Sequence, residues 1–304
     1  MHCRCCAVQS GALTGGKDRA ALLTEASLIL AAVFWGANYA ATKFAALSMP
    51  PVSIVAVRFL VAGLLMYCVL RVLEPESRLV RKDLLPMAGL GCLGVAVGQT
   101  TFTFGVSMTS AANTGFIFAT APVWGLLFGF VLGLERPTWR GTSGVGLSIL
   151  GVGVIFYEGF GLEGANLIGN LLVLLAAMGF GTYTVLSMRL LGRYSPLAVA
   201  TYPILFGGPL VLLISVPFFA APGWGGVGAW AAVAFSAVFA TAFAFSAWQT
   251  GVSRIGANRV LIYQYLISLT GVASGVVFFG EVLGAEKLVG GAVTLAGVCL
   301  ARRQ

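Results

Sequence analysis

The residues Ala111–Gly151 read AANTGFIFATAPVWGLLFGFVLGLERPTWRGTSGVGLSILG, with an apolar segment, an acidic turn at Glu135 and the start of a second apolar segment. A similar pattern returns 146 residues later in Ala257–Gly297, where Glu281 stands at the position of Glu135. Four glycine pairs share this offset, two before the acidic residue and two after it. They are Gly125 and Gly271, Gly129 and Gly275, Gly144 and Gly290, and Gly151 and Gly297. The common offset predicts an internal repeat.

The composition is typical of an all-α integral membrane protein. The chain has 304 residues, of which 59% are hydrophobic and 9% are charged, whereas a soluble domain carries about 25% charged residues. An apolar helix needs about 20 residues to cross a bilayer, so this length allows roughly ten crossings with short loops.

Ten apolar segments, separated by short polar breaks, are the predicted membrane spans. They lie near residues 26–47, 52–71, 84–107, 111–134, 138–157, 166–190, 196–218, 228–250, 257–280 and 284–301. The preceding residues 1–25 include a run rich in Gly, Ser and Thr, and we expect them to form a disordered cytoplasmic tail.

The distribution of positive charge supports ten spans and orients them. With a cytoplasmic N-terminus, 15 of the 18 Lys and Arg residues fall in the tail and the cytoplasmic loops, as the positive-inside rule requires. They are Arg4, Lys17, Arg19, Arg71, Arg78, Arg81, Lys82, Arg136, Arg140, Arg189, Arg193, Arg254, Arg259, Arg302 and Arg303. We therefore expect both termini to be cytoplasmic. This role accounts for the net charge of +8 without nucleic acid.

The offset of the repeat covers five spans, and this odd number inverts the second half relative to the first. Residues 26–157 and 166–301 then form two five-helix repeats of opposite orientation. Glu135 falls on the cytoplasmic side and Glu281 on the other side. Two inverted halves with a substrate site between them are typical of transporters, whose halves rock to expose the site alternately.

Several motifs resemble the EamA group of the drug/metabolite transporter superfamily. They are Phe34–Tyr39 with Lys43, Pro51 with Arg58 and Phe59, Thr109–Asn113, Pro122, Gly133–Glu135, Gly256–Ala257 and Gly280–Glu281, together with the repeated glycines. The resemblance covers nearly the whole chain from about Leu28 onward. It implies ten helices in a five-plus-five inverted repeat, and export of amino acids, aromatic ones included, or of other small metabolites. One departure is Ser268, where the family has proline, so we expect a straighter helix there than at Pro122.

Polar and aromatic side chains within the spans are the candidate substrate-binding residues. They are Trp35, Asn38, Tyr39, Gln99, Thr103, Tyr183, Trp248, Gln249, Tyr263 and Gln264. An amide in lipid is costly unless it is hydrogen-bonded, so these groups should face the interior of the bundle. Amides beside aromatic rings suit a small amphipathic solute. The alternative is that they form interhelical hydrogen bonds or interfacial aromatic belts, which applies most to Tyr39 and Trp248.

Two cations, Lys43 and Arg58, are the candidates for contact with an anionic group such as a substrate carboxylate. Arg58 lies about two turns inside the second span, and Lys43 lies near the end of the first, from which it can reach the membrane surface. The alternative for Arg58 is the same reach to the surface, or bonding to carbonyls at a helix end.

The repeated glycines and acidic residues have structural interpretations. Gly125, Gly129, Gly271 and Gly275 allow close helix packing, either static or as a contact at which helices move. Glu135 and Glu281 are placed to bind exposed N–H groups near the start of the next helix, which we favour over proton coupling.

The sequence offers no group for catalysis, for a metal or for proton coupling inside the spans. All ten acidic residues fall in the tail, loops or span ends, and the only histidine is His2. Ser143 fits a Gly-x-Ser-Gly pattern of intramembrane serine proteases, but no histidine in the spans could act as its base. The spacing of Cys3, Cys5 and Cys6 does not resemble a structural zinc site. We therefore hypothesise a facilitator without a cofactor, which moves substrate down its own gradient.

The predicted function is export of small metabolites, foremost amino acids with aromatic or other apolar side chains, across the plasma (inner) membrane. The alternatives are a multidrug or nucleotide-sugar transporter of the same superfamily, or an intramembrane enzyme. A nucleotide sugar demands several basic groups to meet its phosphates, and the spans offer only Lys43 and Arg58. The expected partners are a small-molecule substrate and the lipid bilayer, with the protein a monomer or weak homo-oligomer.

Overall fold

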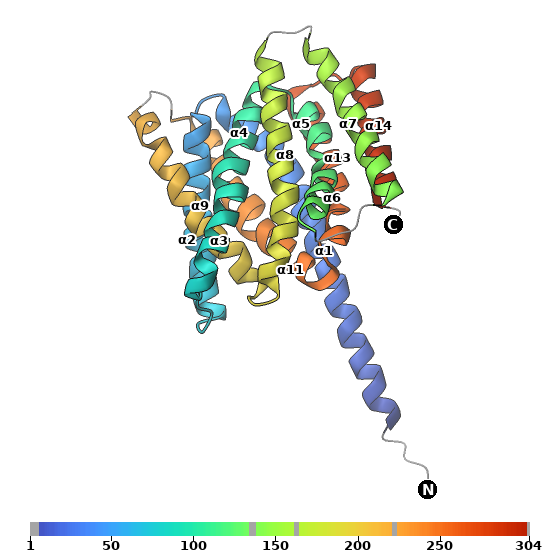
Figure 1. Cartoon of the computed structure of the whole chain (residues 1–304). Coiled ribbons are helices and arrows are strands. Elements are labelled where there is room, and N and C mark those ends of the chain that lie inside the picture. The colour runs from blue at the N-terminus through green and yellow to red at the C-terminus, as the bar shows by residue number, and fades with distance from the viewer. Residues whose placement is uncertain (1–5, 134–137, 161–163, 221–223, 303–304) are drawn as a thin grey trace.

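A computed structural model describes residues 6–133, 138–160, 164–220 and 224–302, and all regular structure in these ranges is helical (Figure 1). The elements of the first half are α1 (Cys6–Ala46), α2 (Pro51–Leu73), η1 (Arg81–Asp83), α3 (Leu84–Gly91), η2 (Cys92–Val97), α4 (Gly98–Met108), α5 (Ala111–Phe118), α6 (Ala121–Val131) and α7 (Trp139–Phe160). Those of the second half are α8 (Gly164–Leu191), α9 (Pro196–Ser215), η3 (Val216–Ala220), α10 (Val227–Ala237), η4 (Val238–Phe243), α11 (Ala244–Ile255), α12 (Ala257–Val260), α13 (Tyr263–Phe279) and α14 (Ala285–Arg302). The predicted all-α class is confirmed.

Seven segments of the described ranges are long and apolar enough to cross a membrane. They are Arg19–Ala46, Pro51–Leu73, Arg81–Met108, Ala111–Val131, Leu167–Leu191, Pro196–Phe219 and Val227–Ile255, with Tyr263–Phe279 as a shorter apolar helix. Large apolar side chains such as Leu213, which is 71% exposed, lie on the outside of the bundle. Lipid is the environment that suits such a surface, so the chain is an integral, multi-pass membrane protein.

The first helix is longer than the predicted span. α1 begins at Cys6, so residues 6–25 are helical in the structure, where we expected a disordered tail. The stretch Lys17–Glu25 consists mostly of Ala, Leu, Lys, Arg and Glu, which favour helix, and it contains no proline. The helix of the first span therefore continues beyond the bundle (Figure 1).

The two halves share an irregularity at the repeat offset. A π-helical turn, η2, separates α3 from α4, and a second one, η4, separates α10 from α11 at the repeat offset of 146 residues. π-helical turns are rare and occur frequently at functional sites. Their return at the same offset supports an internal repeat in the structure.

The helices that carry Pro122 and Ser268 are interrupted at different places. α5 and α6 are separated at Ala119–Thr120, with Pro122 in the first turn of α6. α13 runs unbroken through Ser268, as the missing proline led us to expect. However, Leu261–Ile262 separates it from α12, so the second helix is interrupted about one turn earlier in the repeat rather than being straight throughout.

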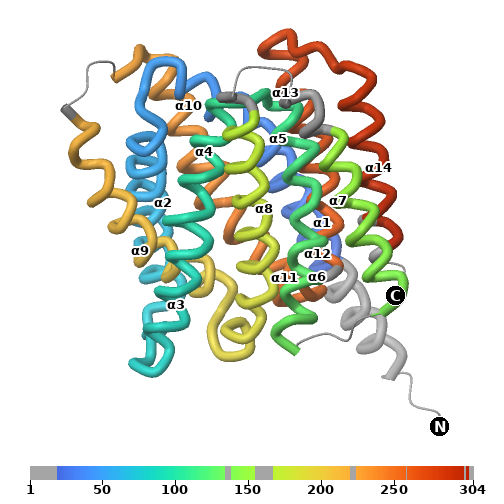
Figure 2. Tube along the Cα trace, turned by 45° about the horizontal axis from the view of Figure 1, so that its top comes forward, coloured from blue at the N-terminus to red at the C-terminus, as the bar shows by residue number. Residues whose placement is uncertain are grey.

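The first helix of each half packs against the other half. α1 contacts α11 and α13, and α8 contacts α4 and α6. Gly36 on α1 faces Gly271, and Gly181 on α8 faces Gly125, so closely that an added Cβ would collide with the opposite backbone. Small residues allow such close approach. One contact between the halves therefore runs through the middle of the bundle, around α1 and α8 (Figure 2).

α7 and α14, which are equivalent helices of the two halves, pack together along one side of the bundle (Figure 2). A Cβ on Gly151 would collide with Thr294, and one on Gly297 would collide with Ser148. Each contact is the repeat equivalent of the other, which is the arrangement expected across a pseudo-twofold axis between these helices.

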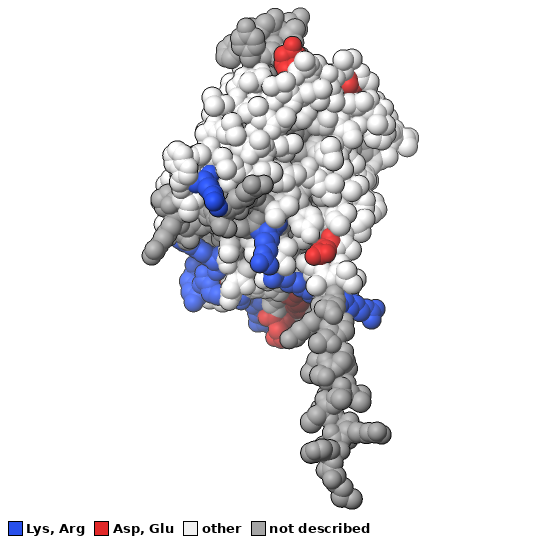
Figure 3. All heavy atoms as spheres, turned by 90° about the vertical axis from the view of Figure 1, so that its right-hand side faces the viewer, with Lys and Arg blue, Asp and Glu red and all other residues white. Residues whose placement is uncertain are grey.

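Two loops with basic residues meet on one side of the molecule. Arg193 Nη1, in the loop after α8, lies 2.7 Å from Asp83 Oδ1 in η1, and the Tyr194 hydroxyl donates to Asp83 Oδ2 at 2.8 Å. In the view of Figure 3, Lys and Arg gather over the lower part of the face. The contact places two loops that we predicted to be cytoplasmic on the same side of the bundle.

Candidate functional site

A small cavity lies between the two halves. Its volume is about 30 Å³, which is room for about two water molecules. It is lined by Trp35, Asn38, Tyr39, Arg58, Gln99, Phe102, Phe118, Phe180, Gln264 and Ile267. These residues come from both halves of the chain. Six of them are among the twelve side chains that the sequence suggested for contact with substrate.

Arg58, on α2, brings a buried positive charge to the cavity. The residue is 1% exposed, and its Nε donates to Thr241 Oγ1 at 2.6 Å. Its Nη1 is buried without a hydrogen-bond acceptor among the described residues. The guanidinium carbon lies 4.9 Å from the centre of the Phe59 ring. Because a guanidinium does not lose its proton in a protein, this group remains charged.

The π-helical turn η4 and the residues just before it hold three lining residues in place. The Thr241 hydroxyl, which accepts from the guanidinium, donates to the Ser236 carbonyl at 2.8 Å. Ser236 Oγ in turn donates to Asn38 Oδ1. Trp35 Nε1 donates to the Ala240 carbonyl at 2.6 Å. The second half therefore positions cavity residues of the first half.

Aromatic rings form an apolar wall of the cavity. Trp35 meets Phe180 edge to face, with ring centroids 5.5 Å apart and planes at 88°. Phe118 lies 5.6 Å from Phe102 and 5.7 Å from Phe180 by the same measure. These separations are typical of favourable aromatic pairs, so the wall is a packed surface against which an apolar body can lie.

Several polar groups at or near the cavity have no well-placed hydrogen-bond partner among the described residues. The Tyr39 hydroxyl faces the Gln264 amide, and neither has a partner at good hydrogen-bonding geometry among the described residues. The hydroxyl of Thr103, on α4 next to the lining residue Phe102, also has none. A buried polar group without a partner costs about 1–3 kcal/mol. These groups are therefore available to a solute or to water.

Three of the predicted residues, Tyr183, Trp248 and Gln249, lie together behind the cavity wall and do not line it. Gln249 Nε2 donates to the Tyr183 hydroxyl at 3.0 Å, and Ser187 Oγ donates to Gln249 Oε1 at 3.1 Å. Trp248 Nε1 donates to Thr184 Oγ1 at 3.2 Å. Their hydrogen bonds join α8 to α11, so these three side chains support the cavity wall from behind.

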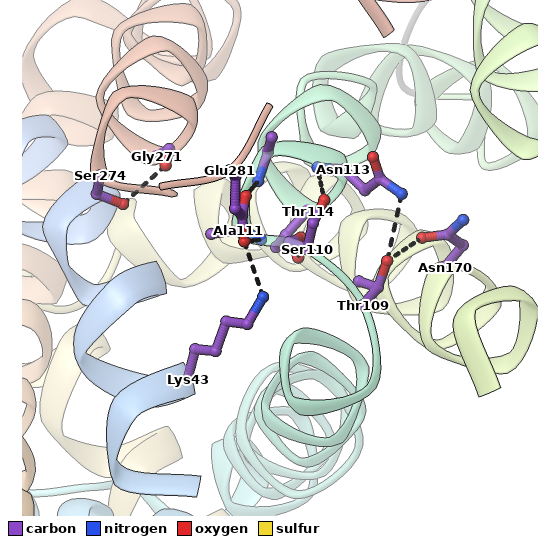
Figure 4. A network of polar contacts seen from close by, with 11 residues as sticks. Lys43, Thr109, Ser110, Ala111, Asn113, Thr114, Asn170, Gly271, Ser274 and Glu281 are labelled. Atoms are coloured by element: carbon purple, nitrogen blue, oxygen red, sulfur yellow. Dashed lines mark hydrogen bonds and ion pairs between the residues drawn. The ribbon is translucent and has the colours of Figure 1, made fainter. Parts of the chain in front are cut away.

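Lys43 and Tyr263 also lie outside the lining. Tyr263 is the first residue of α13 and is partly buried. Lys43 Nζ lies 2.8 Å from Glu281 Oε1, in an ion pair that is largely buried (Figure 4). The anion that Lys43 contacts in this structure is therefore a carboxylate of the protein itself.

Glu281 caps α5 rather than the helix that follows it in sequence. Its Oε1 accepts from the backbone N–H of Ala111 at 2.9 Å, and Oε2 accepts from that of Ala112 at 2.8 Å (Figure 4). The sequence predicts this interaction near the start of the next helix, α14, and the structure corrects the partner to α5. Gly280, with φ 62°, turns the chain after α13 so that the carboxylate reaches the other half.

The surroundings of Glu281 favour its charged form. Burial alone would raise the pKa of this carboxyl group. The hydrogen bonds from Lys43 and from the N–H groups of Ala112 and Ala111 outweigh burial, so the pKa lies below its ordinary value. The carboxylate also meets the positive end of the α5 dipole. Glu135, its repeat counterpart, lies outside the described residues.

The glycines chosen for helix packing lie on buried faces. Gly271 leaves room for the ring of Tyr39, and Gly275 lies against Ala111, whose Cβ would be 3.0 Å from an added Cβ. Gly125 faces α8, and Gly129 is buried on α6. Gly271 thus connects the packing of α1 on α13 directly to the shape of the cavity.

Four lining residues were missed by sequence reasoning: Phe102, Phe118, Phe180 and Ile267. Apolar residues carry no signal of their own in a chain with 21 phenylalanines. The repeat offers the signal that could have found two of them. Phe118 is the counterpart of Gln264 at an offset of 146 residues, and Phe180 is the counterpart of Trp35 at an offset of 145.

Comparison with known families agrees with this architecture. The model of the EamA-like transporter family matches residues 22–157 and 167–303, one match for each half. The chain belongs to the EamA-like transporter family. It is therefore a transporter of the drug/metabolite type, and the resemblance that the motifs suggested is confirmed.

Similar proteins include transporters from bacteria and archaea. A probable terminal-alkyne amino-acid exporter of Streptantibioticus cattleyicolor is 29% identical over 91% of this chain and 93% of its own length. An uncharacterized transporter of Archaeoglobus fulgidus is 24% identical over 91% of this chain and 98% of its own. A solved crystal structure matches with a TM-score of 0.65 and 18% identity, over 90% of this chain and 94% of that one. This last similarity concerns the fold alone.

Proposed function

We propose that this EamA-family transporter exports small metabolites, foremost amino acids with aromatic or other apolar side chains, across the plasma (inner) membrane. The observation that supports this most is the cavity between the halves, whose lining combines aromatic rings with unpaired polar groups. Such a lining suits a small amphipathic solute. The similarity to a probable amino-acid exporter points to the same class.

The proposed mechanism is alternating access between two inverted five-helix halves. A cavity of about 30 Å³ is too small for an amino acid, so substrate binding requires the halves to move apart. We propose ten crossings with both termini cytoplasmic. The seven long apolar segments, the shorter Tyr263–Phe279, and α7 and α14 together account for ten.

We further propose that transport is facilitative. Proton-coupled transporters commonly use a buried carboxylate or histidine, and none of the cavity-lining residues is Asp, Glu or His. The same lining contains one cation, Arg58, whereas a nucleotide sugar requires several. We assign no enzymatic activity and no cofactor, and we expect a monomer or weak homo-oligomer in the lipid bilayer.

Efflux from proteoliposomes tests this function. Vesicles with the purified protein are loaded with one labelled amino acid at a time, and release is compared with that from vesicles without protein. We expect protein-dependent release of apolar and aromatic amino acids down their gradients. Release of none of them contradicts the assigned substrates, and accumulation against a gradient driven by a pH difference alone contradicts facilitation.

A further inference from the structure

The positive charge of Arg58 lacks a counter-charge in the part of the protein that the structure describes. The ion pairs formed there by Lys43 with Glu281 and by Arg193 with Asp83 do not involve it. A buried cation without a partner is costly. Because none of the cavity-lining residues is acidic, an anion that enters the cavity is the counter-charge that this site lacks.

A hydrogen bond orients the guanidinium of Arg58, but no acidic residue of the cavity lining neutralises its charge. Its Nε is fixed by the hydroxyl of Thr241 at 2.6 Å, and that hydroxyl is itself fixed because it donates to the Ser236 carbonyl. Nη1 remains without an acceptor among the described residues. The planar fork of an arginine matches a carboxylate in both geometry and charge. A carboxylate at this position would replace a missing acceptor and a missing charge together.

The remainder of the lining discriminates among the other parts of a solute. An apolar or aromatic body finds the rings of Trp35, Phe118 and Phe180. An ammonium group finds only neutral acceptors, such as the amides of Gln99 and Gln264. The cavity therefore has a charged partner for an acid and none for an amine.

This reasoning rests on the proposed function and narrows its substrate class. We propose that the transported species is a small organic monocarboxylate whose anion binds Arg58 and whose body lies against the aromatic wall. An α-amino group is not required. Apolar amino acids then form the subset of these carboxylates that carry an additional ammonium group.

Four solutes with a phenyl ring test the charge preference in the unaltered protein. They are 3-phenylpropanoate, phenylalanine, 3-phenylpropanamide and 2-phenylethylamine, measured by efflux from proteoliposomes after subtraction of protein-free vesicles. We expect the two carboxylates to move about 10-fold faster than the amide and the amine. Equal protein-dependent efflux of all four overturns the inference but leaves a transporter of amphipathic solutes. Efflux of none contradicts both.

Substitutions of Arg58 test whether this residue provides the preference. In Arg58→Gln, carboxylate efflux should fall about 10-fold or more, while efflux of the neutral amide is not reduced. Arg193→Gln is the matched control, because it removes the same kind of charge outside the cavity lining, at the ion pair with Asp83. It should keep the carboxylate preference. A carboxylate preference that survives in folded Arg58→Gln overturns the inference.

Two further measurements keep the test decisive. If Arg58→Gln does not elute as folded protein on gel filtration, Arg58→Lys replaces it, because lysine keeps the charge without the fork. We expect a higher KM for 3-phenylpropanoate in Arg58→Lys, and an unchanged KM overturns the inference. Chloride tests an inorganic counter-ion. Competition by chloride at the concentration of 3-phenylpropanoate shows that the site does not select organic carboxylates.

Discussion

The contact between α1 and α4 and the contact between α8 and α11 are equivalent in the two halves, but only the first leaves its polar groups unpaired. Thr42 on α1 and Thr103 on α4 have no hydrogen-bond partner among the described residues. Their counterparts are Ser187 and Gln249, at offsets of 145 and 146 residues, and these two side chains bond to each other at 3.1 Å. The equivalent polar side chains are thus hydrogen-bonded to each other in the second half and unpaired in the first.

This difference accompanies the unequal share of the two halves in the cavity, because seven of the ten lining residues come from the first half. In the second half, Tyr183 and Trp248 fill the space between the helices, and Gln249 satisfies the tyrosine hydroxyl. The counterparts of the two aromatic residues are Asn38 and Phe102, which are smaller and which line the cavity. A binding site can therefore arise from a symmetric scaffold when one copy exchanges large, paired side chains for smaller ones.

The largest effect is expected from giving the first half the polar pair of the second. In Thr42→Ser with Thr103→Gln, the new amide should point at Asn38, as that of Gln249 points at Tyr183. It should occupy the cavity and reduce efflux of the transported solutes by about 10-fold or more, without lowering thermal stability.

Thr103→Val is the matched control for that double variant, because it removes the unpaired hydroxyl without adding volume. Its efflux should fall less than that of the double variant, because the space of the cavity is kept. Unimpaired efflux in the double variant, with the protein folded, shows that this hydrogen-bond pair does not decide where the cavity lies.

A smaller effect, on stability, distinguishes two glutamines. Gln249→Leu leaves the partners Tyr183 and Ser187 without their hydrogen bonds and should lower the free energy of unfolding by about 1–3 kcal/mol. Gln264→Leu removes an amide that has no well-placed partner, so stability should be unchanged or higher while efflux falls. Thermal unfolding in detergent and efflux from vesicles are measured for both. Equal destabilisation by the two substitutions contradicts the contrast between the paired and unpaired clusters.

Glu281 joins the two halves, and its contribution to stability should depend on pH. Because its pKa is lowered in the folded protein, this contribution is fully present above the ordinary carboxyl pKa and is lost as the pH falls through the lowered value. At neutral pH, Glu281→Gln should cost about 1 kcal/mol, since it weakens the α5 cap and leaves Lys43 unpaired.

The difference in unfolding midpoint between Glu281→Gln and the unaltered protein, followed from pH 7 down through the acidic range, tests this account. It should shrink as the pH falls, because the protonated carboxyl group then resembles the amide. A difference that stays constant over the range indicates that the charge of Glu281 does not stabilise the contact with α5.

The sequence predicted the architecture well because the repeat marks backbone contacts that recur. Gly151 and Gly297 were found as a pair by their offset, and the structure places them at equivalent contacts between α7 and α14. Small residues at close helix contacts cannot be enlarged, so their spacing survives where the surrounding sequence has diverged. The helical class and the membrane location followed from composition in the same way.

The site was predicted less completely because it depends on how helices are interrupted and paired. Pro122 indicated an irregular helix near the break between α5 and α6, but no sequence pattern gave the effect of this break on the cavity or the position of the π-helical turn η4. The break and the turn decide that Phe118 lines the cavity and that Thr241 meets Arg58. Similarly, nothing local indicates that Glu281 binds α5 rather than α14, since that choice depends on how the two halves approach each other.

The smallest predicted effect concerns two equivalent side chains between α7 and α14. Ser148 Oγ donates to the Thr294 carbonyl at 3.2 Å, whereas Thr294 Oγ1 has no partner among the described residues. Ser148→Ala should therefore lower stability by about 0.5 kcal/mol, and Thr294→Val should not lower it, although the positions are 146 residues apart in the repeat. Unfolding midpoints measured on both variants in one detergent decide this. Equal losses of stability in the two variants would mean that Ser148 and Thr294 contribute equally to the contact between α7 and α14. The difference between the halves would then be limited to the residues around the cavity.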